Sequence, residues 1–141
     1  MSVNVLYRTK ATATGGRDGR SHTDDGTLDV ALTIPKELGG NGAVGNNPEK
    51  LFATGYSACF LSAMKFVALQ GGPKVPDTTT VSAIVGIGPR SEGGFGLEVE
   101  LDISLPGVPR EDAEALIEKA EHVCPYSNAL RGNVQVTRKL V

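Results

Sequence analysis

Two cysteines are the residues of this chain whose chemistry can go beyond packing. Cys59 lies in the middle of a long apolar stretch, and Cys124 follows an amphipathic one. A cysteine reacts as its thiolate, so a reactive cysteine needs a feature that lowers its pKa. A buried cysteine on an apolar helix face is more often a small core residue, and burial raises its pKa. Residue type alone leaves both interpretations open for Cys59. Cys124 has a similar alternative as a small apolar residue at a helix end.

A reactive Cys59 requires a cation from another part of the chain. Arg17 is the best candidate, because it stands in a glycine-rich turn and guanidinium stays charged when partly buried. The Glu49 carboxylate can hold that guanidinium by a bidentate contact. Both residues also have simpler explanations: Arg17 as an exposed turn residue, and Glu49 as a carboxylate that complements the helix dipole. Glu49 and Cys59 lie about 15 Å apart along one helix. An arginine side chain could just span this distance, but a pairing that draws on two chains is equally possible. Arg17 could therefore come from the same chain or from a partner chain.

The histidines give no catalytic or metal-binding pattern. Two cysteines and two histidines without zinc-site spacing predict that no metal is bound. His122 fits the C-terminal end of a helix, where the dipole favours it, and His22 lies in a polar segment. A cysteine hydrolase that uses Cys59 with a histidine base is therefore a minor alternative. A second alternative is a ligand carrier without enzymatic activity, built around an apolar pocket.

The longest predicted element is a helix over residues 47–70, which contains Cys59. Asn47 can cap it, Pro48 suits its first position, and the glycines after residue 70 end it. Its residues are small or apolar on nearly every side. A helix of this kind must be covered on nearly every side, and a chain of 141 residues offers little to cover it with. The pattern therefore predicts a partner chain.

The remaining segments predict an α+β protein with a mainly antiparallel sheet. An amphipathic helix is predicted over 111–122, followed by a short turn over 124–131. Alternating segments rich in Val, Ile and Thr predict strands over 3–14, 28–34, 78–88, 95–105 and 134–140. The length predicts one domain, covering residues 1–141.

Composition narrows the possible partners. The chain has 14 basic and 16 acidic residues and no basic run, so we expect neither nucleic acid nor an anionic membrane as a partner. The N-terminus lacks the features of a signal peptide, and the charges on the long helix argue against a membrane span. We therefore expect a cytoplasmic protein. In that compartment a cysteine pair points to redox chemistry or metal binding rather than to a structural disulfide.

Four short motifs occur in order along nearly the whole chain. They are Gly-Gly-Arg17-Asp-Gly, Asn-Pro-Glu49, Gly-Tyr-Ser-Ala-Cys59 and Val-Cys124-Pro-Tyr-Ser-Asn-Ala. Each motif alone is weak, but together they resemble the organic hydroperoxide resistance proteins, the Ohr branch of the Ohr/OsmC superfamily. The segment Gly-Gly-Phe-Gly-Leu at 93–97 fits as well, and the Cys124 motif favours Ohr over the OsmC branch.

This resemblance implies a fold, a reaction and partners. The fold would be OsmC-like, with mainly antiparallel sheets packed on a long central helix in an intertwined homodimer. The reaction would be that of a thiol peroxidase, with Cys59 as peroxidatic and Cys124 as resolving cysteine. Arg17 would stabilise the Cys59 thiolate, and Glu49 would orient Arg17. No cofactor would be bound, since the usual electron donor of the family is a dihydrolipoyl group on a lipoylated protein.

An apolar surrounding of Cys59 would favour organic substrates. Each buried methylene of an alkyl chain contributes about 0.8 kcal/mol. We therefore expect a preference for alkyl or fatty-acid hydroperoxides over hydrogen peroxide. The aromatic residues expected to line the substrate site, each of which could equally belong to the core, are Phe52, Tyr56, Phe66, Phe95 and Tyr126.

Overall fold

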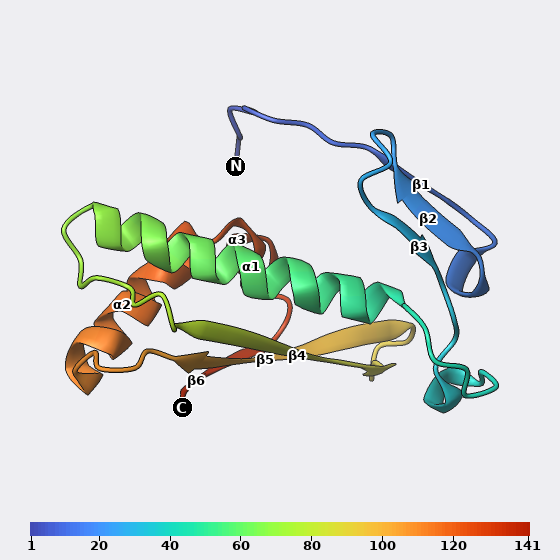
Figure 1. Ribbon diagram of the computed structural model, residues 1–141. Coiled ribbons are helices and arrows are strands. Elements are labelled where there is room, and N and C mark those ends of the chain that lie inside the picture. Colours follow the sequence, from blue (N-terminus) through green and yellow to red (C-terminus); the bar gives the residue numbers. More distant parts are fainter. The chain divides into compact units, whose positions relative to one another are not determined.

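The computed structural model describes residues 1–141 and divides into two compact units, Met1–Pro48 and Glu49–Val141. Each unit is described by itself (Figure 1). The prediction of one domain over residues 1–141 stays a prediction. The predicted α+β class is confirmed, because helices and two small sheets alternate along the chain.

The first unit contains one small antiparallel sheet in the order β1-β2-β3. Its strands are β1 (Ala11–Thr14), β2 (Arg20–Thr23) and β3 (Asp29–Ala31), and two 3-10 turns complete it, η1 (Gly16–Asp18) and η2 (Lys36–Leu38). The β1–β2 turn depends on its glycines. Gly15 and Gly16 have positive φ angles of 74° and 65°, which side chains other than glycine rarely adopt. This turn carries Arg17 within η1.

The first unit has almost no core of its own. Leu32 and Asn47 are its only buried residues, and every residue of β1 is exposed. A three-stranded sheet needs an apolar face packed on something to be stable. Within one chain the first unit therefore contributes backbone pairing but little apolar burial.

The second unit begins with the long helix α1 (Pro48–Leu69). The helix starts at a proline, as predicted, and stops before Gly71, whose φ is 97°. One side of α1 is buried, formed by Tyr56, Phe60, Ala63, Met64 and Val67. The predicted helix over 47–70 is thus confirmed to within one residue at each end.

A three-stranded sheet in the order β4-β5-β6 follows. The strands are β4 (Thr80–Pro89), β5 (Phe95–Ser104) and β6 (Val136–Leu140). β4 and β5 pair antiparallel as a hairpin, whereas β5 and β6 pair parallel. A parallel pair needs a crossover connection, and two helices provide it here: α2 (Arg110–Val123) and α3 (Pro125–Leu130).

One face of the β4–β5–β6 sheet carries the core, and α1 lies along that face (Figure 1). The inward residues of β5 alternate with exposed or half-buried ones, as expected for a half-buried strand. They form one cluster with the buried sides of α1 and α2. The fully buried or nearly buried members of this cluster include Tyr56, Phe60, Met64, Val99, Leu101, Ile103, Leu116 and Cys124.

Three predicted elements differ from the structure. The strand predicted over 3–14 is confined to β1, and residues 1–10 belong to no helix or strand. β2 was not predicted, because its residues are polar and give no apolar alternation. It pairs through backbone contacts and through Arg20, whose Nε donates to Asp29 Oδ1 over 2.7 Å. The turn expected over 124–131 is helical and forms α3.

α1 also departs from the expectation about membrane spans. By length and composition alone it is apolar enough to cross a membrane. Core helices of soluble proteins meet the same criterion, and one side of α1 packs into the core cluster. Only 28% of its most apolar 18-residue window is buried within the chain. Other residues of the helix, including Ala58 and Phe66, are exposed.

Candidate active site

The structure brings the two cysteines together. The thiol of Cys124 donates to the sulfur of Cys59 over 3.5 Å, although the residues are 65 positions apart. Both are free cysteines; Cys124 is buried and Cys59 half-buried. A disulfide needs a distance of about 2.05 Å between the sulfur atoms. The pair is therefore in contact in its reduced form, with a short approach left before a bond could form.

Cys124 is placed by the junction between α2 and α3. Its backbone is extended and links the two helices, because α2 ends at Val123 and Pro125 starts α3. Its N–H donates to Ala120 O over 2.8 Å. The side chains of Asn128 in α3 and of Arg131, which directly follows α3, donate to carbonyls in the last turn of α2, over 3.0 Å in each case. These contacts cap α2 and fix the start of α3.

A second contact joins α1 to α3 beside the cysteines. The hydroxyls of Tyr56 and Ser127 hydrogen-bond over 2.8 Å. Tyr56 is 0% exposed and Ser127 is 5% exposed. Tyr56 precedes Cys59 by three positions, and Ser127 follows Cys124 by three. The two helices therefore run antiparallel here and touch at two points one turn apart.

The environment of Cys59 favours the neutral thiol. Burial raises the pKa of Cys59 to about 11, a hydrogen bond from the backbone N–H of Tyr126 lowers it, and the neighbouring Cys124 raises it. This direction confirms the expected effect of burial. Within Glu49–Val141 no cation is among the groups that shift this pKa. A reactive thiolate therefore needs a cation from outside that unit.

Three aromatic side chains gather next to the cysteines. The ring centroids of Phe52, Tyr56 and Tyr126 lie 5.7 to 5.9 Å apart, within the range of favourable aromatic pairs. Gly55 leaves room for them, because a Cβ at that position would lie 2.9 Å from the Tyr126 hydroxyl oxygen. Tyr56 is fully buried, so the surface that this cluster leaves accessible comes from Phe52 and Tyr126.

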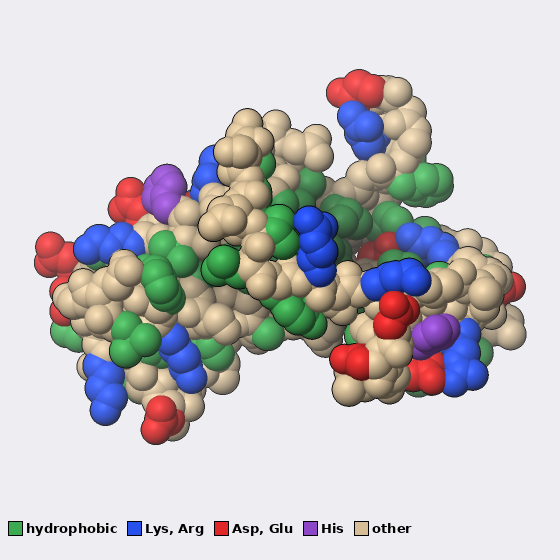
Figure 2. All heavy atoms as spheres, turned by 90° about the horizontal axis from the view of Figure 1, so that it is seen from above, with side chains coloured by type: hydrophobic (Ala, Val, Ile, Leu, Met, Phe, Trp, Pro, Cys, Tyr) green, Lys and Arg blue, Asp and Glu red, His purple; other side chains and the backbone are tan.

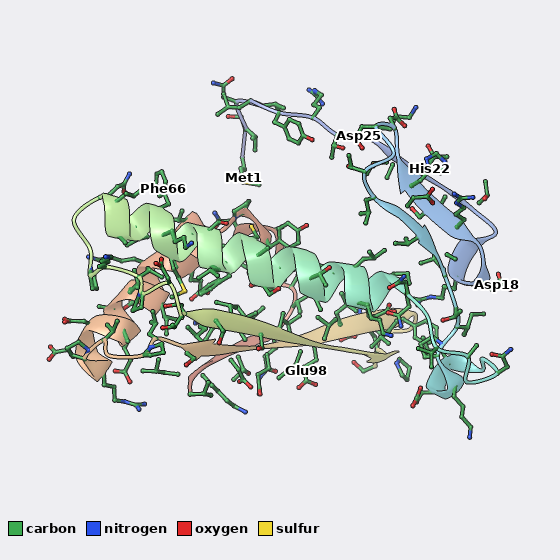
Figure 3. All side chains as sticks on the ribbon, in the orientation of Figure 1. Met1, Asp18, His22, Asp25, Phe66 and Glu98 are labelled. Carbon is green, nitrogen blue, oxygen red and sulfur yellow. The ribbon has the colours of Figure 1, made fainter.

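Two aromatic residues expected at the site lie outside this cluster. Phe95 begins β5 and is 69% exposed. Phe66 lies on α1 and is 49% exposed, and its side chain points away from the β4–β5–β6 sheet (Figure 3). Neither is among the buried or partly buried hydrophobic residues of the core. A substrate-lining role for Phe95 stays a prediction.

Arg17 and Glu49 belong to different units. Arg17 is half-buried in η1, and Glu49 is half-buried in the first turn of α1. Their roles stay predictions. His122 is exposed near the end of α2, and a ring nitrogen of His22 lies 3.3 Å from Thr23 O. No group of three or more His, Cys, Asp or Glu residues comes together as metal ligands.

Two residues near the cysteines were not singled out from the sequence. Ser127 supplies the hydroxyl that bonds Tyr56, and Gly55 gives the Tyr126 ring its space. Both lie inside the quoted motifs around Cys59 and Cys124. The motifs were the available signal, but only the packing of α3 on α1 shows what these two residues contact.

Comparison with known proteins gives the family of the chain. The OsmC-like protein family model matches residues 39–139. The organic hydroperoxide resistance protein of Xanthomonas axonopodis pv. citri is 53% identical over 136 residues, which is 96% of this chain and 95% of that protein. The crystal structure of an organic hydroperoxide resistance protein from Elizabethkingia anophelis, with thiocyanate bound, has a TM-score of 0.91 at 52% identity, covering 98% of each chain.

A third relative comes from Vibrio cholerae. Its crystal structure, of a putative organic hydroperoxide resistance protein with captopril bound in one of the active sites, has a TM-score of 0.91 at 43% identity. The match covers 99% of this chain and 95% of that one. The family model and these relatives together confirm the resemblance seen in the four motifs. The chain therefore belongs to the OsmC-like family and, within it, to the organic hydroperoxide resistance proteins.

Proposed function

We propose that this protein is a cysteine-based peroxidase that reduces organic hydroperoxides to alcohols. The observation that carries the proposal is the contact of two free thiols, Cys59 and Cys124, over 3.5 Å. Aromatic side chains adjoin this pair. The relatives are named for resistance to organic hydroperoxides. An enzyme that reduces these compounds to alcohols would make a cell resistant to them.

The first step would take place at the Cys59 sulfur. Its thiolate attacks the terminal oxygen of the hydroperoxide, the O–O bond breaks, and the alkoxide takes up a proton to leave as an alcohol. Cys59 becomes a sulfenic acid and is thereby oxidised, while the hydroperoxide is reduced. Cys59 is half-buried rather than closed off, so a substrate can reach it.

The second step would use Cys124. Its thiol condenses with the Cys59 sulfenic acid, a sulfur–sulfur bond forms, and water leaves. The sulfur atoms need to approach by roughly 1.5 Å for this bond, which small shifts of α3 can supply. A dithiol then reduces the disulfide by exchange. We propose a dihydrolipoyl group on a lipoylated protein as the external donor, with no bound cofactor, and a cytoplasmic location.

Activation of Cys59 is assigned to Arg17 and Glu49. Burial holds the pKa of Cys59 at about 11 within its own unit, so a neutral thiol would predominate at physiological pH. The Arg17 guanidinium would reverse this by favouring the charged form. Glu49 would hold the guanidinium by a bidentate contact. Both residues are half-buried, which strengthens a charge interaction compared with full exposure.

Substrate preference would follow from the aromatic cluster. Phe52 and Tyr126, whose rings pack together and on the buried ring of Tyr56, keep accessible apolar surface. Burying an alkyl group against them is favourable by about 0.8 kcal/mol per methylene. Hydrogen peroxide has no such group. An active site of the Vibrio cholerae relative holds captopril, an organic molecule much larger than hydrogen peroxide. We therefore propose alkyl or fatty-acid hydroperoxides as substrates.

We also propose a homodimer, because one chain leaves three of its surfaces uncovered. The first unit has only two buried residues. Residues 3–10 have strand composition but pair with no strand of this chain, and Val3, Leu6 and Tyr7 are exposed. The outer face of α1 is exposed at Ala58, Phe66 and other positions. Figure 2 shows hydrophobic side chains on the surface of the single chain. A second copy would cover apolar surfaces of this kind.

A thiol count tests the proposed reaction. One equivalent of cumene hydroperoxide is added to the reduced protein, and free thiols are titrated. A peroxidase loses both thiols and forms a Cys59–Cys124 disulfide, which dihydrolipoamide restores to thiols. A ligand carrier or a hydrolase keeps both. The Cys59→Ser variant is the control, because its remaining thiol should survive. Retention of both thiols in the unsubstituted protein would exclude the proposal.

A second experiment tests the substrate class. The catalytic efficiency is measured with tert-butyl hydroperoxide, a fatty-acid hydroperoxide and hydrogen peroxide, using dihydrolipoamide as reductant. The organic substrates should be preferred, with the fatty-acid hydroperoxide at least as good as the smaller one. Equal efficiency for all three would contradict a role for apolar contacts.

A further inference from the structure

The buried hydrogen bond between Tyr56 and Ser127 is unexplained by the reaction steps themselves. We propose that these two residues are positioning residues that hold Cys124 beside Cys59, so that the Cys59 sulfenic acid is captured as a disulfide before a second hydroperoxide can oxidise it. This inference rests on the proposed peroxidase function. It concerns how fast the intermediate is resolved, and not how fast it forms.

The geometry ties the hydroxyl pair directly to the sulfur pair. Tyr56 and Ser127 are in contact over 2.8 Å, and Cys59 and Cys124 over 3.5 Å. Each residue of the hydroxyl pair lies three positions from a cysteine, which is about one helical turn. The two contacts thus lie side by side between α1 and α3. A shift of α3 that separates the hydroxyls would also separate the sulfurs.

The composition of α3 makes the hydroxyl contact important for docking. α3 has six residues, and its only buried one is Ser127. A helix normally docks through an apolar stripe, but here the buried position is polar. Tyr126 adds a ring contact to Tyr56, yet it is exposed. The other anchors of α3, from Asn128 and Arg131, lead to α2 rather than to α1. Besides the Tyr126 N–H that donates to the Cys59 sulfur, the Tyr56 hydroxyl is therefore a buried polar attachment of α3 to the helix that carries Cys59.

Burial makes this hydrogen bond costly to break. Both hydroxyls are shielded from water, and losing one partner would leave the other unsatisfied. Burial also raises the pKa of the Tyr56 hydroxyl, so the phenol stays protonated and can donate at physiological pH. Its partner Ser127 can accept or donate. The pair is therefore a persistent neutral contact, not one that depends on charge.

Two reactions compete for the sulfenic acid. In the first, Cys59–SOH and Cys124–SH give the disulfide and water. In the second, Cys59–SOH and another hydroperoxide give the sulfinic acid and an alcohol, which ends the catalytic cycle. The first reaction requires the sulfur of Cys124 within bonding reach, whereas the second requires only substrate. Loosening α3 should therefore shift the outcome toward the sulfinic acid.

The test separates the two steps with the variants Tyr56→Phe, Ser127→Ala and their combination. Rapid mixing of each reduced protein with cumene hydroperoxide gives the rate constant for oxidation of Cys59 and the rate constant for disulfide formation. We expect oxidation to change less than about twofold and disulfide formation to slow about tenfold, as for loss of one buried hydrogen bond. The combined variant should be no slower than the slower single one, because both remove the same contact.

Further readouts keep a folding defect apart from a positioning effect. Each variant is also treated with increasing concentrations of hydroperoxide and analysed by mass spectrometry. In the Tyr56→Phe and Ser127→Ala variants, the Cys59 sulfinic acid should appear at a hydroperoxide concentration about tenfold lower than in the unsubstituted protein, in line with the slower resolution. Ser127→Thr retains the hydroxyl and should restore disulfide formation. The matched control is Ser57→Ala, whose hydroxyl bonds Thr54 O of its own helix. If Tyr56→Phe does not fold, Ser127→Ala with its threonine rescue still decides.

The outcomes distinguish this inference from the proposed function. If the unsubstituted protein forms no Cys59–Cys124 disulfide with hydroperoxide, the proposed function fails. If it does form, but the Tyr56 and Ser127 variants resolve at the unsubstituted rate, the positioning inference alone is overturned. A parallel loss in both steps would overturn it as well, because it would show a general defect of the site.

Discussion

The sulfur of Cys124 lies 3.5 Å from the sulfur of Cys59. Tyr126, two positions after Cys124, donates its backbone N–H to the Cys59 sulfur. One short segment thus supplies both the second thiol and a hydrogen-bond donor to the first. The N–H favours the Cys59 thiolate, whereas burial opposes it. Burial has the larger effect, so the pKa of Cys59 is raised and its neutral thiol is favoured.

Replacing Cys124 by serine should separate oxidation of Cys59 from its resolution. The first step needs only Cys59, so the variant should still consume about one equivalent of hydroperoxide. The sulfenic acid would then persist or go on to the sulfinic acid, because no thiol stands 3.5 Å away. Turnover with dihydrolipoamide should fall at least about tenfold, since the disulfide that it reduces no longer forms. Mass spectrometry of Cys59 and steady-state rates measure the two effects.

Unchanged steady-state turnover in Cys124→Ser would mean that the reductant attacks the sulfenic acid directly. The control is Cys59→Ser, in which Cys124 remains buried without its partner. That variant should not consume hydroperoxide at a measurable rate. Activity in Cys59→Ser would show that Cys59 is not the peroxidatic cysteine.

The pH dependence of the reaction tests the role of Arg17. The thiolate is the deprotonated form, so a higher pKa means less thiolate at every pH below it. In Arg17→Ala we expect the Cys59 pKa to rise toward about 11, the value that burial gives it without a cation. The rate with organic hydroperoxide should then increase about tenfold per pH unit through the neutral range, whereas the unsubstituted protein should level off at a much lower pH.

Arg17→Lys sharpens this measurement. Lysine retains the charge but lacks the planar fork, so it should restore part of the rate lost in Arg17→Ala. Arg110→Ala is a control, because Arg110 is an exposed arginine at the start of α2. Superimposable pH–rate profiles for the Arg17→Ala variant and the unsubstituted protein would remove Arg17 from the mechanism.

The exposed face of α1 tests the proposed homodimer. Ala58→Arg places a long, charged side chain on this face, where Ala58 is exposed in the single chain. A partner helix packed there could not accommodate it without burying an unpaired charge. We expect light scattering to show a monomer, with a lowered Tm and with most of the peroxidase activity lost. The loss should follow the oligomeric state as protein concentration is varied.

A matched change on another surface provides the control for Ala58→Arg. Glu98→Arg alters an exposed residue of β5 on the sheet face that does not carry the core. It should change neither mass in solution nor turnover. A monomeric unsubstituted protein with full activity would contradict the proposed homodimer.

The helices could be predicted from the sequence because their signals are local. Pro48 and the glycines after residue 70 mark the ends of α1 in the chain itself, and the charged and apolar positions of α2 repeat with the helical period. β2 could not be predicted in this way. Its residues Arg20–Thr23 are polar, and they form a strand only because neighbouring strands lie on both sides.

The chemistry of the site was partly accessible from the sequence. The motifs named both cysteines, but their contact depends on α3 folding back along α1, a relationship between residues 65 positions apart. Ser127 shows the limit most clearly. In sequence it is an ordinary polar residue at a helix start, and its burial against Tyr56 arises only from the packing of two helices. Phe95 shows the converse, because an aromatic residue in a fitting motif is mostly exposed in the chain.

Gly55→Ala tests whether the Tyr126 ring shapes the substrate site. An added Cβ would lie 2.9 Å from the Tyr126 hydroxyl oxygen and 3.4 Å from its ring carbons, so the ring must move. Alanine favours the helix by about 1 kcal/mol over glycine, and the displaced atoms are the outer end of an exposed side chain. Stability should therefore be unchanged or slightly higher.

The catalytic effect of Gly55→Ala should depend on substrate size. A displaced Tyr126 ring removes apolar surface beside Cys59, so efficiency with a fatty-acid hydroperoxide should fall about four- to fifteenfold, the equivalent of one or two methylene contacts. Efficiency with hydrogen peroxide should change little, because it makes no such contact. Gly88→Ala is the control, since a Cβ there meets no atom within 4 Å. An equal loss for both peroxides would show that the ring acts on the Cys59 thiolate, through the N–H of its own residue, and not on the substrate.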